Sequence, residues 1–99
     1  MYARITPYKM KPGSKKAAVK IMQSLKSRIQ ELPGQHQFIN TINDTDGSGY
    51  VISLTDIPDV TPEMADKIRA LWASFNDFLE VQPSPATFEV VANWEMADA

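Results

Sequence analysis

Hydrophobic and polar positions partly alternate in four short segments of the chain and follow a helical spacing in two longer ones. Residues 2–10, 35–43, 50–56 and 86–94 carry β-branched and aromatic residues in the partly alternating pattern of strands. Residues 15–32 and the segment beginning at Pro62 place apolar residues three and four positions apart, as amphipathic helices do. The order β-α-β-β-α-β predicts an α+β fold of the ferredoxin-like type with an antiparallel sheet.

Turn and cap residues mark where these elements begin and end. Ser14 is placed to cap the first helix, and Pro33-Gly34 ends it. Thr61-Pro62 has the residues of a helix start, and the apolar stripe that follows continues to Leu79, ahead of two prolines. The acidic and glycine-rich segment 44–49 predicts a hairpin between the second and third strands.

Two helices can cover only one face of such a sheet, so the other face should be polar if it meets water. The strand patterns instead place apolar residues on both faces, as with Val51 beside Ile52 and Val90 beside Val91. A chain of 99 residues has a thin core, and two-fold dimers are the commonest assemblies. We therefore expect a homodimer in which sheet packs on sheet.

Composition excludes some functions but does not identify one. The chain has 99 residues, 43% of them apolar and 22% charged, which predicts a single globular domain over residues 1–99. With no cysteine and one histidine, it offers neither a thiolate nor a histidine cluster for a metal, so we expect no metal and no cofactor. No apolar run is long enough to span a membrane and no leader is evident, which predicts a cytoplasmic protein.

The net charge of −2 conceals an uneven distribution and argues against nucleic-acid binding. Residues 1–30 hold eight of the ten basic residues and no acid, whereas residues 31–99 hold two basic residues and all twelve acids. The two segments thus carry charges of +8 and −10. Either the basic segment steers an anionic ligand, or two solvated faces of opposite sign complement one another within the fold or across a dimer.

Several short motifs, taken in order, carry a resemblance that covers nearly the whole chain. They are Lys11-Pro12-Gly13 after the first strand, Leu32-Pro33-Gly34, Phe38-Ile39-Asn40, Gly47-Ser48-Gly49-Tyr50, Trp72 with Phe75, and Phe88-Glu89-Val90-Val91. In this order and spacing the sequence resembles the antibiotic biosynthesis monooxygenase (ABM) domains of the dimeric α+β barrel superfamily. The resemblance implies a pocket between sheet and helices in each protomer and two sheets facing each other across a dimer.

The resemblance also implies two kinds of chemistry. Characterised ABM enzymes oxidise polycyclic phenols and quinols without a cofactor, because an electron-rich substrate anion can itself reduce oxygen. A second branch degrades haem with a strand asparagine, a helix tryptophan and a helix histidine. Trp72 matches that tryptophan, but Thr6 and Gln82 stand where the other two are expected, so haem degradation is set aside.

Six residues are candidates for the site. His36 is the only side chain that ordinarily titrates near neutral pH, and Asn40 shares its strand parity, so we predict that these two are catalytic, as proton acceptor and oxyanion donor. Trp72 and Asn76 are four residues apart, which places them on one helix face. Each candidate also has a purely structural reading, as packing or solvated surface. The predicted substrate-binding residues are Trp72, Asn76, Phe38 and Tyr50.

Two functions remain open from the sequence. The first is a cofactor-independent monooxygenase that acts on a small aromatic or quinol-like substrate. The alternative is a non-catalytic module of the same fold that binds a small ligand or serves in assembly. The absence of a Ser-His-Asp set, a P-loop and a dinucleotide-binding glycine pattern makes the enzyme classes that need them improbable.

Overall fold

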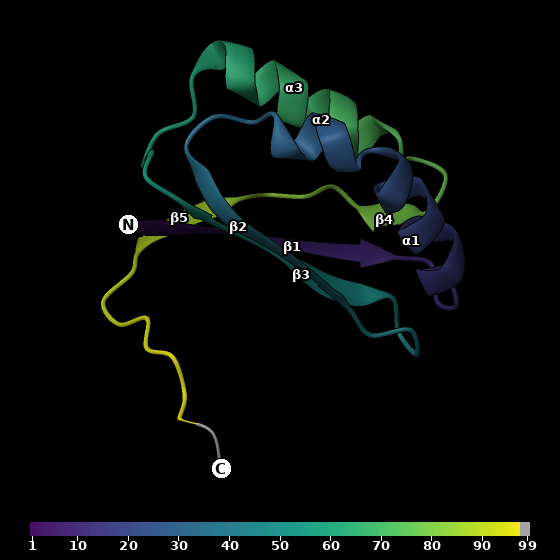
Figure 1. Cartoon of the computed structure of the whole chain (residues 1–99). Coiled ribbons are helices and arrows are strands. Elements are labelled where there is room, and N and C mark those ends of the chain that lie inside the picture. Colours follow the sequence, from purple (N-terminus) through teal and green to yellow (C-terminus); the bar gives the residue numbers. More distant parts are fainter. Residues whose placement is uncertain (98–99) are drawn as a thin grey trace.

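The computed structural model describes residues 1–97 and consists of two layers, with the helices on one side of a single antiparallel sheet (Figure 1). In chain order the elements are β1 (Tyr2–Met10), α1 (Lys15–Ser24), α2 (Lys26–Gln30), β2 (Gln35–Ile42), β3 (Ser48–Thr55), α3 (Pro62–Ala73), β4 (Leu79–Val81) and β5 (Ala86–Glu89).

The sheet has the strand order β2-β3-β1-β4, and β5 also pairs with β1. All of these pairings are antiparallel. Since β4 pairs with the end of β1 and β5 with its beginning, the two form one interrupted fourth strand. The predicted ferredoxin-like α+β fold is thus confirmed, with its last strand in two pieces.

The first helical segment is interrupted where one continuous helix was predicted. Leu25 separates α1 from α2, and its amide donates to the carbonyl of Met22 at 3.0 Å, a tighter turn than that of an α-helix. The Leu25 side chain is buried in the core cluster. The break keeps the predicted apolar stripe directed at the sheet while the chain bends over it.

The prediction that the second helix extends to Leu79 is wrong. Helix α3 ends at Ala73, and residues 74–78 follow as tight turns in which Phe78 donates to the carbonyl of Phe75 at 2.9 Å. Leu79 then pairs with Met10 of β1. The apolar spacing persists through the turns because Phe75 still packs into the core, so periodicity alone did not reveal the helix end.

The last strand is also shorter than the predicted segment 86–94. It ends at Glu89, opposite Tyr2, and Val90 adds one further hydrogen bond to the carbonyl of Met1 at 3.0 Å. Beyond that point the pairing of β5 with β1 ends. Figure 1 shows the following segment leaving the sheet on the side away from the helices.

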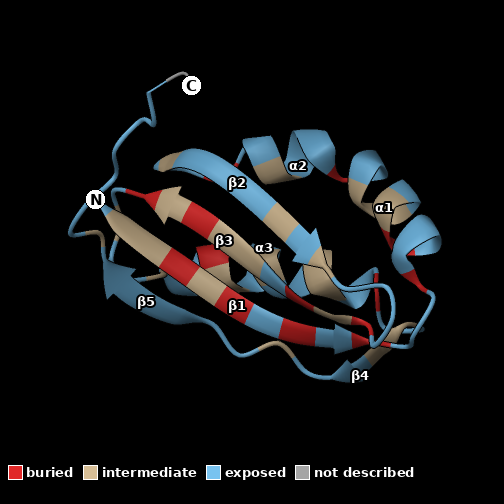
Figure 2. Cartoon of the chain, turned by 90° about the horizontal axis from the view of Figure 1, so that it is seen from below, coloured by how far each residue is buried: buried red, intermediate tan, exposed pale blue. Residues whose placement is uncertain are grey.

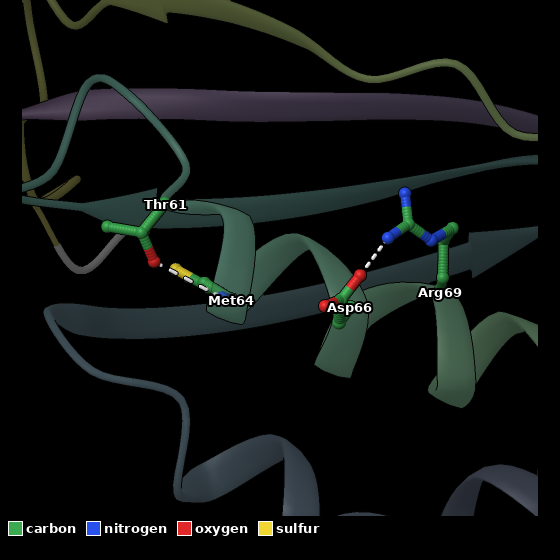
Figure 3. Close-up of polar contacts among 4 residues, drawn as sticks. All are labelled: Thr61, Met64, Asp66 and Arg69. Carbon is green, nitrogen blue, oxygen red and sulfur yellow. Dashed lines mark hydrogen bonds and ion pairs between the residues drawn. The ribbon is translucent and has the colours of Figure 1, made fainter.

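The two long helices begin differently. Thr61 caps α3 as predicted, because its hydroxyl accepts from the amide of Met64 at 3.2 Å, and Asp66 pairs with Arg69 one turn later (Figure 3). Ser14 occupies the cap position of α1, but its hydroxyl donates to the carbonyl of Lys11. The carboxylate of Asp44, from the β2–β3 hairpin, accepts from the amide of Lys15 instead.

We predict that Gly47→Ala destabilises the fold much more than Gly13→Ala. Both glycines have a φ of 79°, which costs an alanine about 1–2 kcal/mol. A Cβ on Gly47 would also overlap the carbonyl oxygen of Met10, whereas no described atom lies within 4 Å of a Cβ on Gly13. Urea denaturation of both variants measures the difference, and equal losses would contradict the tight packing of this hairpin against β1.

Candidate functional site

The helix-covered face of the sheet carries more buried polar residues than packing against two helices would suggest. Four polar residues of β1 and β3 are buried on the side that the helices cover, namely Arg4, Thr6, Ser53 and Thr55. On the open side, Ile5, Ile52 and Leu54 are half-exposed, and Ile39 and Phe88 are exposed. Figure 2 shows the resulting alternation of burial along β1 and β3. Polar groups beneath helices indicate a lined site on that side.

Two hollows lie on the helix side, and four residues line both of them: Arg4, Thr6, Ile68 and Trp72. The inner one, of about 80 Å³, lies between the sheet and all three helices, and its lining includes Phe38 and Asn40. The outer one, of about 560 Å³, lies between α3 and the interrupted edge strand, and its lining includes Asn76, Gln82, Pro83 and Pro85. The break between β4 and β5 thus borders the larger hollow.

The Trp72 indole is held between two other rings. Its centroid lies 5.5 Å from that of Tyr8 and 6.1 Å from that of Phe75, both in tilted arrangements. Tyr8 and Phe75 are buried, and Trp72 is half-buried. The ring therefore packs against the core and also lines both hollows.

A short polar chain connects β1, β2 and α1 beside this ring. The Tyr8 hydroxyl lies 2.7 Å from the carbonyl oxygen of Thr41 and 2.9 Å from Oδ1 of Asn40, and it donates to them. The Asn40 amide donates to the sulfur of Met22 at 3.0 Å. Burial raises the pKa of Tyr8. Because a thioether is a weak acceptor, the Asn40 amide could donate to a stronger one, such as an oxyanion.

Arg4 is the most unusual group in the site. Its side chain is 5% exposed, and its Nε and Nη2 are buried without a hydrogen-bond partner, as is Oε1 of Gln35. Desolvation lowers the pKa of Arg4, although a guanidinium stays protonated near neutral pH. Breaking a buried ion pair costs about 3–5 kcal/mol because it leaves such an uncompensated charge.

His36 lies outside both hollows. Its Nε2 is 2.8 Å from a carboxylate oxygen of Asp56, and both side chains are about half-exposed or more. His36 lines an open surface groove of about 400 Å³ between β2 and the first two helices, which it shares with Gln35 and Phe38. The sequence did not reveal Asp56 as a partner because the two residues meet only through the pairing of β2 with β3.

The structure brings together four of the six predicted site residues around Trp72. Phe38 and Asn40 line the inner hollow with it, and Asn76 lines the outer one, although Asn76 lies in the turns beyond α3. Tyr50 lies on the open face of the sheet and is 53% exposed, so it is remote from these hollows. The roles of all six remain predictions.

Sequence reasoning gave too little weight to the polar residues of β1 and β3. Arg4, Thr6 and Tyr8 occupy alternate positions of β1, so they point to one face, and Ser53 is the partner of Arg4 on β3. A charged residue within such an alternation was the signal that could have identified this face as a site.

Within residues 1–97, no group of three His, Asp or Glu side chains is arranged to hold a metal ion. No helix in the same range combines the length and apolar character that crossing a membrane requires.

Comparison with solved structures identifies the fold. A "putative antibiotic biosynthesis monooxygenase" from Bordetella bronchiseptica superposes with a TM-score of 0.75 at 7% identity, over 92% of this chain and 97% of that one. One of the same name from Nitrosomonas europaea gives 0.67 at 12% identity, over 93% and 100%. A protein of unknown function from the same organism gives 0.68 at 18% identity, over 98% and 95%.

No protein-family model and no curated protein matches the chain significantly. At these low identities the structural similarity establishes the fold alone. The chain has the ABM-type α+β fold, as its motifs predict, and its neighbours include proteins named as monooxygenases and one whose function is unknown.

We predict that Tyr8→Phe lowers stability by about 1 kcal/mol near neutral pH, because it removes a partly buried hydroxyl from its acceptors. The raised pKa of Tyr8 means that the unfolded chain loses this proton first. The wild-type contribution is therefore complete below pH 10 and is lost as the pH rises through the folded-state pKa. Urea denaturation at pH 8 and pH 10.5 should show a smaller difference between the proteins at the higher pH.

The exposed Tyr50 provides the control, since Tyr50→Phe removes a solvated hydroxyl and should change stability little at pH 8. A difference between wild type and Tyr8→Phe that grows with pH would contradict the burial of the Tyr8 phenol.

Proposed function

We propose that the protein is a cofactor-independent monooxygenase that binds a small aromatic, quinol-like substrate between the sheet and the helices. The observation that carries this proposal is the pair of hollows that both include Trp72 in their lining. Polar groups of β1 are buried there beneath the helices, where packing alone would favour apolar residues. The ABM-type fold of the neighbours supports the same assignment. We also propose a cytoplasmic location, as the sequence predicts.

The reaction needs little from the protein because the substrate supplies the electrons. A deprotonated quinol reduces molecular oxygen: its two ring hydroxyls become carbonyls, one oxygen atom is retained as a new ring hydroxyl, and the other leaves as water with two hydrogens of the substrate. The product is a hydroxylated quinone, so atoms and electrons balance without another reductant. The protein binds the ring, orients it and favours its anion.

Within this proposal each polar residue has a definite role. The Asn40 amide exchanges the Met22 sulfur for the oxyanion of the substrate. Asn76 contacts a polar group of the substrate in the outer hollow. His36, oriented by Asp56, accepts the phenolic proton where the substrate reaches the surface groove, which shares Phe38 with the inner hollow. Phe38 and Trp72 hold the ring.

The alternative, a ligand-binding module without catalysis, is favoured by the small inner hollow and by the protein partners that Asn40 already has. Catalysis and binding alone are distinguished by whether oxygen is consumed. A module that only binds would protect the ligand or leave it unchanged.

We expect 1,4-dihydroxynaphthalene to be oxidised faster with the protein than without it. Trp72→Ala should lower kcat/KM at least tenfold, whereas Trp72→Phe, which keeps a ring, should retain most of it. Oxygen uptake and the hydroxylated quinone, both corrected for autoxidation, are the measurements. If several quinols cause no uptake above background, the proposal fails, and an unchanged pH–rate profile in His36→Ala would remove His36 from the mechanism.

We also propose that the open face of the sheet packs on a second copy of this chain. The face carries Ile5, Ile39, Ile52, Leu54 and Phe88, which no helix covers. The segment after Val90 extends on this same side with Val91, Trp94 and Met96 exposed by 93%, 84% and 88%. Apolar side chains in a segment with no strand beside it would find apolar surface on the partner.

Sedimentation should therefore give a species of about twice the 11.1 kDa chain mass at micromolar concentration. Ile52→Asp, in the middle of the open face, should shift the protein to monomer because it places a charge in the contact. Lys16→Asp, on the exposed surface of α1, should leave the dimer intact. A wild-type protein that sediments as a monomer would refute the covered-sheet argument.

A further inference from the structure

The Arg4 guanidinium lies beneath the helices without an anion. Its strand neighbours in register are Ser53 on β3 and Thr87 on β5, both uncharged. The nearest acid along β5 is Glu89, which is exposed and forms no ion pair with it. Among residues 1–97, the described ion pairs all lie elsewhere, at His36, Lys67 and Arg69.

The two unpartnered nitrogens define the shape of the missing group. Nε and Nη2 share one edge of the guanidinium plane, and their N–H bonds are parallel. This edge matches the two oxygens of a carboxylate in a bidentate contact, whereas a single phenolate oxygen satisfies only one donor well. Arginine is suited to this geometry, and a lysine at the same position would supply only a point charge.

The surroundings of Arg4 define the rest of the ligand. Arg4 lines both hollows with Trp72, and most other lining residues are apolar, including Leu25, Ile68 and Leu71. An aromatic ring against Trp72 can thus carry its carboxylate to Arg4. Because Nε and Nη2 are sealed from solvent in the free protein, side chains around them must move to admit the ligand.

We propose that the pocket takes an aromatic carboxylate and that Arg4 binds its two oxygens. This inference rests on the proposed function, since it names the anionic substituent that the ring-binding pocket selects. In the free protein the buried charge is uncompensated, and the ligand supplies the acceptors that the fold leaves out. Arg4 therefore determines specificity for charge, while Trp72 determines specificity for the ring.

Calorimetric titration with 1-naphthoate and its neutral isostere 1-naphthamide tests this directly. The wild type should bind the acid at least tenfold more tightly than the amide, as expected of charge-assisted hydrogen bonds. Arg4→Met should abolish the preference and Arg4→Lys should reduce it. Arg28→Met, which removes an exposed arginine of α2, should retain it, as should Glu89→Gln.

Thermal unfolding provides a second measurement that does not depend on activity. Arg4→Met should melt at least 4 °C above the wild type without ligand, because it removes an unpaired buried charge. Only proteins that retain Arg4 should be stabilised more by 1-naphthoate than by 1-naphthamide. Equal binding of acid and amide, a preference that survives Arg4→Met, no saturable binding of 1-naphthoate, or a response to inorganic phosphate alone would each overturn the inference.

The outcomes also separate this inference from the proposed oxygenase. Arg4-dependent binding of 1-naphthoate, together with no oxygen uptake above background from any quinol, would support the carboxylate site and reject the monooxygenase. Oxidation of neutral quinols that 1-naphthoate does not inhibit would reject the carboxylate site and leave the monooxygenase standing.

Discussion

The sheet of this protein has two faces but only enough helix for one, and buried polar residues lie on the covered face while apolar residues lie on the open one. Arg4, Thr6, Ser53 and Thr55 are covered, while Ile5, Ile52 and Leu54 are left partly open. Polar groups under helices cost free energy unless they have partners, and apolar groups in water add nothing to the core. Both departures are explained together if the covered face binds a ligand and the open face meets another chain.

Most of the fold followed from the sequence because local patterns and topology agree. The first three strands, the start of α3 at Thr61 and the hairpin at Gly47 were all read from alternation, caps and turns. The predictions fail where pairing with a distant strand determines the end of an element. Leu79 joins β4 because Met10 is beside it, and β5 stops at Glu89 because β1 begins at Tyr2. Neither of these boundaries can be read from the sequence of the segment itself.

The site was only partly predictable for a related reason. Trp72, Phe38 and Asn40 stood out as an aromatic and polar set, and they line one hollow. Tyr50 was predicted to belong to the same site. Its strand parity places it on the open face of the sheet, whereas its neighbour Val51 faces the helices. His36 depends on Asp56, a residue twenty positions away that only the register of β2 against β3 brings close.

Strand β1 connects the two proposed surfaces. It pairs with β3 on one edge and with β4 and β5 on the other, so it lies in the interior of the sheet. Arg4 and Thr6 point from it into the hollows, and Ile5, between them, points to the open face. Because consecutive residues of one strand serve the two faces, a shift of β1 on ligand binding would move Ile5 as well. The hollows under the helices and the apolar open face therefore share one strand, whose neighbouring residues face opposite sides.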